Sequence, residues 1–168
     1  MLPVIVIVFV MAGLGGALWV GQAFLTLRFA QAQVAGAWSD LKEALGSRRE
    51  MVPYIVAVVP INISPALDVL GNACDMAANV MGIRECAQAE GRLSAAMVRL
   101  FAQLDAESGL ETREMLNPLR DRLKDQEMKI GVLKDLYNRQ AEVFNTLLKQ
   151  AAAKVLVSFG AFRPAELF

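Results

Sequence analysis

The hydrophobic and polar positions of this chain divide it into one long apolar run and three stretches with helical spacing. The apolar run, Leu2–Leu27, contains no charged residue. A bilayer core of about 30 Å is crossed by about 20 helical residues, so this run is long enough for a transmembrane helix. Trp19 suits the membrane interface, and Arg28 directly follows the run. The pattern predicts a transmembrane anchor over residues 1–28 and a helical domain over residues 29–168.

Two other interpretations of the apolar run fit its pattern less well. A core helix of this length would normally show a polar face. The small residues of Ala30-Gln31-Ala32 suggest a signal-peptide cleavage site, but no Lys or Arg precedes the run, which also exceeds the usual apolar core of about 7–15 residues. We therefore expect an uncleaved anchor. Basic residues follow the run and none precedes it, so the positive-inside rule places residues 29–168 in the cytoplasm.

The rest of the chain has helical periodicity and contains no run of alternating β-branched residues. The anchor helix is expected to continue to about Val59, with a kink at Pro53. Two prolines then interrupt the chain within residues 60–65. A second helix is expected over about residues 65–105 and a third over about residues 112–157. The sequence thus predicts an all-α fold, in which an N-terminal transmembrane helix is followed by an antiparallel bundle of long helices.

The third of these helices repeats an aromatic–asparagine pair after seven residues, as Tyr137-Asn138 and Phe144-Asn145. Seven residues are two helical turns, so both rings lie on one apolar seam and each asparagine lies beside it. This spacing predicts coiled-coil packing within the bundle. The first heptad position of the seam comprises Leu116, Leu123, Ile130, Tyr137, Phe144 and Ala151, and the second comprises Leu119, Gln126, Leu133, Gln140, Leu147 and Lys154.

The asparagines of this repeat have two interpretations. Asn72 and Asn79 are also seven residues apart, in the second predicted helix. If the two helices are antiparallel neighbours, these amides could meet Asn138 and Asn145 in hydrogen bonds that fix the register. Alternatively, all four side chains lie in solvent beside the seams.

The end of the chain is more apolar than a solvated tail. Gly160 is a candidate helix C-cap, and Phe162 and Pro164 follow it. We expect this segment to fold back on the bundle, because an exposed run of this kind would form an adhesive patch. Lying on a membrane surface and docking a partner are the alternatives. The candidate structural or interaction residues of the whole chain are Tyr137, Asn138, Phe144, Asn145, Phe159, Gly160, Phe162 and Pro164.

Composition excludes several classes of function. The chain has no histidine, which excludes a histidine-based catalytic triad or metal site. Basic and acidic residues number 17 each, so there is no basic excess for nucleic acid. Cys74 and Cys86 would lie about 18 Å apart on a continuous helix, which is too far for a disulfide, and we expect two reduced thiols. No phosphate-binding loop or nucleophile elbow is present. We expect no cofactor, no metal and no catalytic residue.

Taken in order, several motifs resemble the LemA family. Residues 37–59 are similar to the family's Trp-led helix with a basic pair, an apolar residue and a proline, here Trp38, Arg48, Arg49, Val52 and Pro53. Further similarities are AEGRLSAAMVRLFAQLD before the last loop, YNRQAEVFN for a repeated Tyr-Asn motif, and GAFRPAELF for a Gly-Phe-Lys-Pro ending. The resemblance implies a bacterial, single-anchor inner-membrane protein with a helical bundle and an unsettled biochemical role. Because the family includes a magnetosome protein, membrane remodelling or organelle biogenesis is a further implication.

The chain departs from the family pattern in three places. PINISP interrupts a stretch that is usually polar and unbroken, so a kinked or split helix is expected there. The Phe-Pro that commonly follows the last Tyr-Asn motif is absent, so the third helix is expected to run further. The second aromatic of the repeat is Phe144, which has no hydroxyl group.

We expect a membrane-anchored, non-enzymatic protein-interaction or scaffolding module, which contacts the lipid bilayer and binds protein partners or copies of itself. The helical seams, the apolar C-terminus and the small residues of GLGG in the anchor favour this hypothesis. Binding of a small molecule or lipid within the bundle is the alternative. An enzyme is the least consistent with these residues.

Overall fold

The computed structural model of the protein describes residues 2–59, 64–107, 110–158 and 160–168. These residues contain no strand, which confirms the all-α prediction. The prediction for Phe159 falls outside the described residues. The helices are α1 (Leu2–Arg49), α2 (Val52–Val58), α3 (Ser64–Asn79), α4 (Ile83–Glu107), α5 (Leu110–Leu148) and α6 (Ala151–Ser158).

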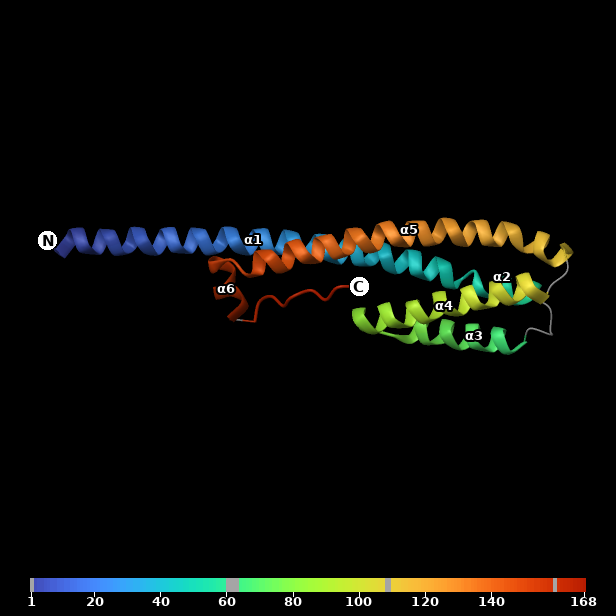
Figure 1. The fold of residues 1–168 in the computed structure, drawn as a ribbon. Coiled ribbons are helices and arrows are strands. Elements are labelled where there is room, and N and C mark those ends of the chain that lie inside the picture. Colours follow the sequence, from blue (N-terminus) through green and yellow to red (C-terminus); the bar gives the residue numbers. More distant parts are fainter. Residues whose placement is uncertain (1, 60–63, 108–109, 159) are drawn as a thin grey trace.

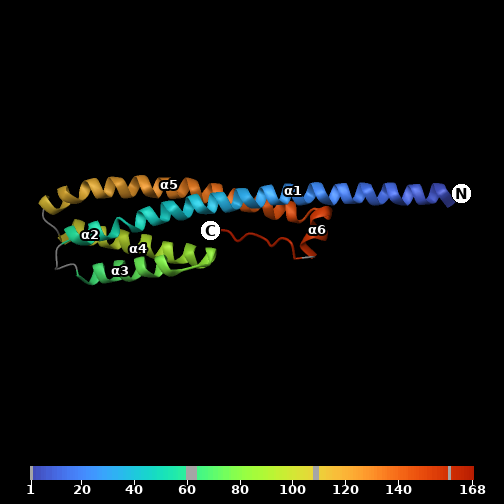
Figure 2. The same cartoon turned by 180° about the vertical axis from the view of Figure 1, so that it is seen from behind.

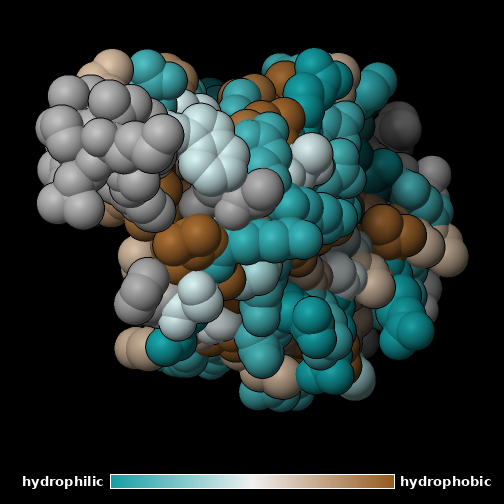
Figure 3. Space-filling view, turned by 90° about the vertical axis from the view of Figure 1, so that its left-hand side faces the viewer, coloured by the Kyte–Doolittle hydropathy of each residue, from teal (hydrophilic) through white to brown (hydrophobic). Residues whose placement is uncertain are grey.

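The helices form an elongated bundle around two long members. Figures 1 and 2 show α5 beside the second half of α1, with the α3–α4 hairpin next to α2 and the short α6 beside α1. The first half of α1 extends beyond the rest of the molecule (Figure 1). Viewed from that end in Figure 3, the bundle shows a largely hydrophilic surface with separate hydrophobic patches.

The break that the sequence predicts near Pro53 is present. Helix α1 ends at Arg49, and α2 begins at Val52 with Pro53 in its first turn. A proline is tolerated there because the amide groups of a first helical turn have no partner within the helix. The backbone amide of Met51 donates a hydrogen bond to Arg48 O across the break.

The prediction of one helix over residues 65–105 is wrong, because the chain turns back at residues 80–82 between α3 and α4. One straight helix would leave much of its apolar stripe without a partner, whereas the hairpin buries Leu70 and Leu93 in one cluster. Gly82 lies in this turn, and the carboxyl group of Glu85 lies where a Cβ atom at residue 82 would be.

The turn separates the two cysteines onto different helices, which removes the continuous helix that the distance argument assumed. Both are nevertheless free thiols, as the sequence predicts. Burial, as the largest cause, raises the pKa of Cys74 and of Cys86. Neither thiol is therefore activated as a nucleophile by its surroundings.

The prediction that the third helix reaches residue 157 is also wrong. Helix α5 ends at Leu148, and a turn at residues 149–150 leads into α6. The amides of Lys149 and Gln150 donate to carbonyl groups three residues earlier and close the last turn of α5. The turn brings Ala153 of α6 into a buried cluster with Leu148, which a straight continuation would not do.

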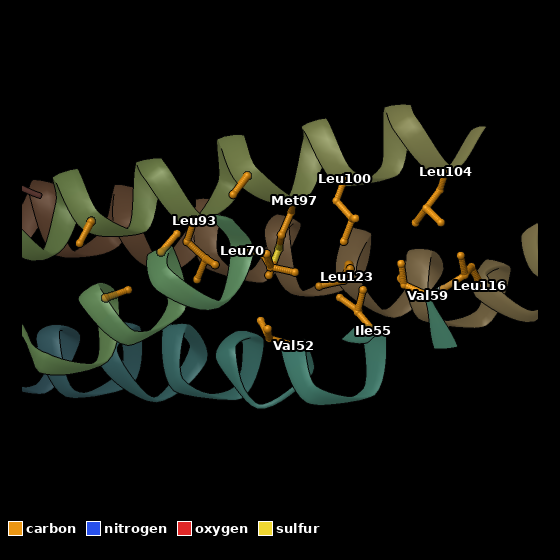
Figure 4. Close-up of a cluster of buried hydrophobic side chains, with 14 residues drawn as sticks. Val52, Ile55, Val59, Leu70, Leu93, Met97, Leu100, Leu104, Leu116 and Leu123 are labelled. Atoms are coloured by element: carbon orange, nitrogen blue, oxygen red, sulfur yellow. The ribbon is translucent and has the colours of Figure 1, made fainter. Parts of the chain in front are cut away.

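The apolar seam of α5 is confirmed at the first heptad position. Its residues that have a described side chain are all buried, namely Leu116, Leu123, Ile130, Tyr137 and Phe144. The second heptad position is half-buried from Leu119 to Leu147, and Lys154 is exposed beyond the end of α5. The largest core cluster packs this seam against α2, α3 and α4 (Figure 4) and includes Ile55, Leu70, Leu93, Leu100 and Leu116.

A buried charged network joins the end of α1 to three other helices. The guanidinium group of Arg48 pairs with the carboxylates of Glu90 on α4 and Glu127 on α5, and donates to Ser94 Oγ at 2.7 Å. Arg49 pairs with Glu90 and donates to the Ala77 carbonyl of α3. Arg48 is only 2% exposed and Glu90 only 3%. Two positive and two negative groups make the network neutral, which compensates for the removal of its central charges from water.

The structure does not support the predicted transmembrane helix over residues 1–28. Within the described part of the chain, no helix meets the length and apolarity needed to cross a bilayer. The side chains of residues 1–10 and 12 lie outside that part.

Replacing Glu90 with Gln tests the buried network. Removing one member of a buried ion pair leaves an uncompensated charge, and we expect the free energy of unfolding to fall by about 3–5 kcal/mol. Urea unfolding followed by circular dichroism measures the change.

Glu127→Gln is the matched control, because Glu127 pairs with the same arginine but is 46% exposed. Its expected cost is at most about 1 kcal/mol. Equal costs for the two variants would show that burial does not determine the strength of this network.

Candidate functional site

The C-terminal segment folds back on the bundle, as the sequence predicts. Gly160 follows α6 with a φ angle of +72°, the left-handed conformation of a helix C-cap, and the next amide donates to Leu156 O at 3.2 Å. Residues 162–168, which we call the tail, are not helical. Figures 1 and 2 show the tail running from α6 back along the bundle.

The two asparagines of the heptad repeat bind the backbone of the tail. Asn145 Nδ2 donates to Ala165 O at 2.8 Å, and Ala165 N donates to Asn145 Oδ1 at 2.8 Å. Asn138 forms the same pair with Phe168, at 3.1 Å from its Nδ2 to Phe168 O and 2.9 Å from Phe168 N to its Oδ1. Each amide side chain thus satisfies one peptide N–H and one C=O of the tail.

The seven-residue spacing of the asparagines matches the geometry of their partner. Seven helical residues rise about 10.5 Å along the axis of α5. Three residues of extended chain, the separation of Ala165 and Phe168, span about 10 Å. Two helical turns also return a side chain to nearly the same face. The repeat therefore places two equivalent amide groups in register with an extended backbone.

A third hydrogen-bond donor to the tail comes from the aromatic seam. Tyr137 is fully buried, and its hydroxyl group donates to Glu166 O at 2.6 Å. Burial, and next the carboxylate of Glu166, raise the pKa of Tyr137 above its ordinary value near 10. The phenol therefore stays neutral over the physiological range and remains a donor.

Aromatic contacts hold both ends of the tail. The ring of Phe168 lies 5.9 Å from that of Trp38 and 5.7 Å from Lys134 Nζ. At the other end, the buried ring of Phe162 lies 6.4 Å from Phe144 and 5.6 Å from Phe24. Edge-to-face and tilted arrangements at these distances are favourable. We call the surface formed by Trp38, Tyr137, Asn138, Phe144 and Asn145 the tail groove.

The interhelical interpretation of the asparagines is wrong, and the solvent interpretation is correct only for Asn72 and Asn79. Asn138 and Asn145 are half-buried, and each forms two hydrogen bonds with the tail. Asn72 is exposed, and Asn79 Nδ2 donates to Asp75 O of its own helix. The structure therefore replaces a helix–helix contact with a helix–tail contact.

The structure brings together most of the residues that the sequence singled out. Tyr137, Asn138, Phe144 and Asn145 line the tail groove, and Phe162 inserts beside Phe144. Gly160 and Pro164 are exposed. The sequence analysis did not assign Trp38 and Lys134 to this site, because their connection to the tail is made only by the fold.

Two further surface features are available for binding. A pocket of about 470 Å³ between α1 and the α3–α4 turn is lined by Trp38, Lys42, Arg49 and Cys86 among others. Two adjoining pockets of about 380 and 400 Å³ lie between α3 and α4 and share Val69, Ala96 and Arg99. We call this pair of pockets the hairpin groove. Among the described residues, no group of three metal-ligating side chains converges.

The fold defines a class of all-helical proteins in which a long N-terminal helix enters a small bundle. The family model of the LemA family matches residues 37–168, and the chain belongs to this family. The matched range contains every side chain that lines the tail groove. The comparison with curated proteins finds no match.

Replacing Asn145 or Asn138 with Ala tests the pairing of the asparagines with the tail. Each substitution removes two hydrogen bonds to a partly buried backbone, and each bond contributes about 0.5–1.5 kcal/mol. We expect amide exchange to accelerate at least about tenfold at Ala165 in the first variant and at Phe168 in the second. Hydrogen exchange measured by NMR reports both amides.

Asn72→Ala is the control, because that side chain is exposed on α3. The pairing is refuted if this variant accelerates the same two amides as strongly as the groove variants do.

Titration of Tyr137 provides a pH test. The folded state holds the proton more tightly than the unfolded state, so this contribution to stability is complete below about pH 10 and decreases as pH rises further. In a Tyr54→Phe variant Tyr137 is the only tyrosine. Its tyrosinate absorbance is expected to appear at higher pH in the folded protein than in urea. Coincident titration curves would contradict the raised pKa.

Proposed function

We propose that this protein is a membrane-anchored, non-enzymatic interaction module of the bacterial inner membrane, with its bundle in the cytoplasm. The observation that carries the proposal is the unequal environment of the two halves of α1. One half is built into the bundle, and the other extends away from it (Figure 1). Large apolar side chains of this outer half, among them Met11 and Leu18, are exposed. Apolar side chains of this kind are stabilised when they are removed from water, and we propose that membrane lipid surrounds them.

The apolar half of α1 supports anchoring by its sequence and by its exposure. Helix α1 has 48 residues, which corresponds to about 72 Å. Leu2–Leu27 has no charged residue. The exposed large apolar side chains of this half include Met11, Leu14, Leu18, Trp19 and Leu25. In water, several large exposed apolar side chains on one helix promote association.

The hairpin groove supports the interaction role. Val69 and Met76 line it and are exposed, and several alanines leave room for close approach. Arg92 and Arg99 also line the groove, and on α4 they are two helical turns apart. An amphipathic helix with an acidic edge would place its apolar face on Val69 and its carboxylates against these arginines. We propose a protein partner of this chemistry.

Binding of a small amphipathic molecule is a second candidate function. The pocket of about 470 Å³ between α1 and the α3–α4 turn combines an aromatic wall at Trp38 with the positive groups of Lys42 and Arg49. Such a combination suits an anion that carries an apolar portion. Arg49 is already paired with Glu90, which leaves Lys42 as the principal charge for such a ligand.

Site-specific photo-crosslinking of the full chain in membranes tests the proposal. A photoreactive residue at Val69, which is 52% exposed in the hairpin groove, is expected to give adducts of one discrete size. The charge reversals Arg92→Glu and Arg99→Glu are expected to reduce these adducts at least about tenfold. The protein itself is expected to stay with the membrane pellet after high-salt and alkaline washes.

Met128 is the matched control position, because it is 58% exposed on α5 and lines neither the hairpin groove nor the tail groove. Equal adducts at Val69 and Met128, or adducts that are insensitive to charge reversal, would argue against a partner in the hairpin groove. Release of the protein by alkaline washing would argue against the anchor.

A further inference from the structure

The geometry points to the tail groove as a peptide-binding site whose occupant can be exchanged, and we propose that it binds the tail of a second copy of this chain. In the structure the groove holds the chain's own tail. The same contacts are available to an identical tail from a neighbouring molecule. This inference goes beyond the interaction role proposed for the hairpin groove, and it does not depend on a partner there.

Recognition in the groove acts mainly on the backbone. All five hydrogen bonds between the tail and Tyr137, Asn138 and Asn145 involve main-chain N–H groups or main-chain oxygen atoms of the tail. The side chains of Glu166 and Leu167 are exposed. The groove therefore requires an extended segment and does not read most of its side chains. This is how proteins bind peptides as extended strands.

The two aromatic ends of the tail supply the specificity. Phe162 and Phe168 are six residues apart, which corresponds to about 20 Å of extended chain. Phe162 is buried beside Phe24 and Phe144, and Phe168 contacts Trp38 and lies near Lys134. A ligand of this groove is thus an extended peptide with aromatic residues at positions one and seven. The tail of a second copy has this pattern because its sequence is the same.

Exchange of the tail leaves the bundle helices intact. The hydrogen bonds to be broken are partly buried ones, and Gly160 provides a connection in a left-handed conformation. When two chains exchange identical tails, each contact that is lost within a chain forms again between the chains. The equilibrium between the closed and the exchanged form therefore depends on the concentration of the chain. The chain's own tail acts at a high effective concentration, and crowding of chains favours the exchanged form.

A peptide with the sequence of residues 160–168 tests recognition by the groove. It carries a fluorophore at its N-terminus and is titrated into the full chain bearing Phe162→Ala and Phe168→Ala, whose own tail is weakened. We expect anisotropy to show binding at least about tenfold tighter than to the wild-type chain, in which the intact tail competes. Absence of saturable binding to the weakened-tail chain overturns the proposal.

N-methylated peptides test the backbone contacts directly. Methylation of the amide of Ala165 or of Phe168 removes a donor to an asparagine, and each is expected to weaken binding at least about tenfold. Methylation at the exposed Leu167 is the matched control and is expected to change affinity less than threefold, an order-of-magnitude bound. Equal loss at all three positions overturns recognition through the asparagines.

Complementation between two full-chain variants tests exchange between copies. One variant has a defective groove, with Asn138→Ala and Asn145→Ala, and an intact tail. The other has Phe162→Ala and Phe168→Ala, and an intact groove. In proteoliposomes, energy transfer between labelled copies is expected to be at least about threefold stronger in the mixture than within either variant alone, because only the mixture pairs an intact groove with an intact tail. Equal transfer in all three samples overturns exchange.

The outcome is independent of the hairpin groove. Loss of crosslinks at Val69 would remove the proposed partner of that groove and would leave the complementation result unchanged. Conversely, failed complementation with intact crosslinks at Val69 removes only the exchange of tails.

Discussion

The packing of the bundle depends on one buried positive charge, the guanidinium group of Arg48, which needs carboxylate partners at fixed positions. Arg48 lies at the end of α1, is almost fully buried, and is paired with Glu90 and Glu127 from two other helices. A guanidinium group cannot be left unpaired in such a position without a large loss of stability. The ion pairs connect α1 to α4 and to α5, so a shift of α1 along either helix would separate Arg48 from a carboxylate. The network therefore favours the register in which these three helices pack.

Helix α5 contributes to two different interfaces from one sequence pattern. Its heptad seam supplies core residues to the bundle, from Leu116 to Phe144. The residues immediately after two seam positions, Asn138 and Asn145, supply amide groups to the tail. Tyr137 belongs to both interfaces, since its ring is buried in the core and its hydroxyl group reaches Glu166 O. Tail binding and bundle packing consequently both depend on the orientation of α5.

The sequence predicts those parts of the fold that depend on local periodicity. The helical class, the break near Pro53 and the buried seam of α5 follow from the spacing of apolar residues and prolines. The turns at residues 80–82 and 149–150 were not predicted, because helical periodicity continues through them and only tertiary packing favours reversal. The partners of the asparagines were missed for a related reason. Asn138 binds a residue 30 positions away, and an extended backbone leaves no pattern in the sequence.

The sequence of α4 contains a signal for the buried network. Glu90 is one residue after Ala89 and three before Leu93, both of which are buried, so its position on the helix places a carboxylate on the core face. A carboxylate in that place requires a positive partner, and the adjacent Arg48 and Arg49 are the basic pair nearest the proline break. Which basic residues pair with Glu90, however, depends on the reversal of the chain between α3 and α4, which helical periodicity does not predict.

Helix α1 is a single uninterrupted helix that passes from the outer end of the molecule into the bundle. The helix runs from Leu2 to Arg49 without a break, so one continuous element connects its outer half with its bundle half. Trp38 in the tail groove and Arg48 in the charged network both lie on this helix. The outer half is therefore connected to the residues that contact the tail by a single helix, with no intervening loop. The first interruption of this connection is the turn at residues 50–51, which lies beyond both Trp38 and Arg48.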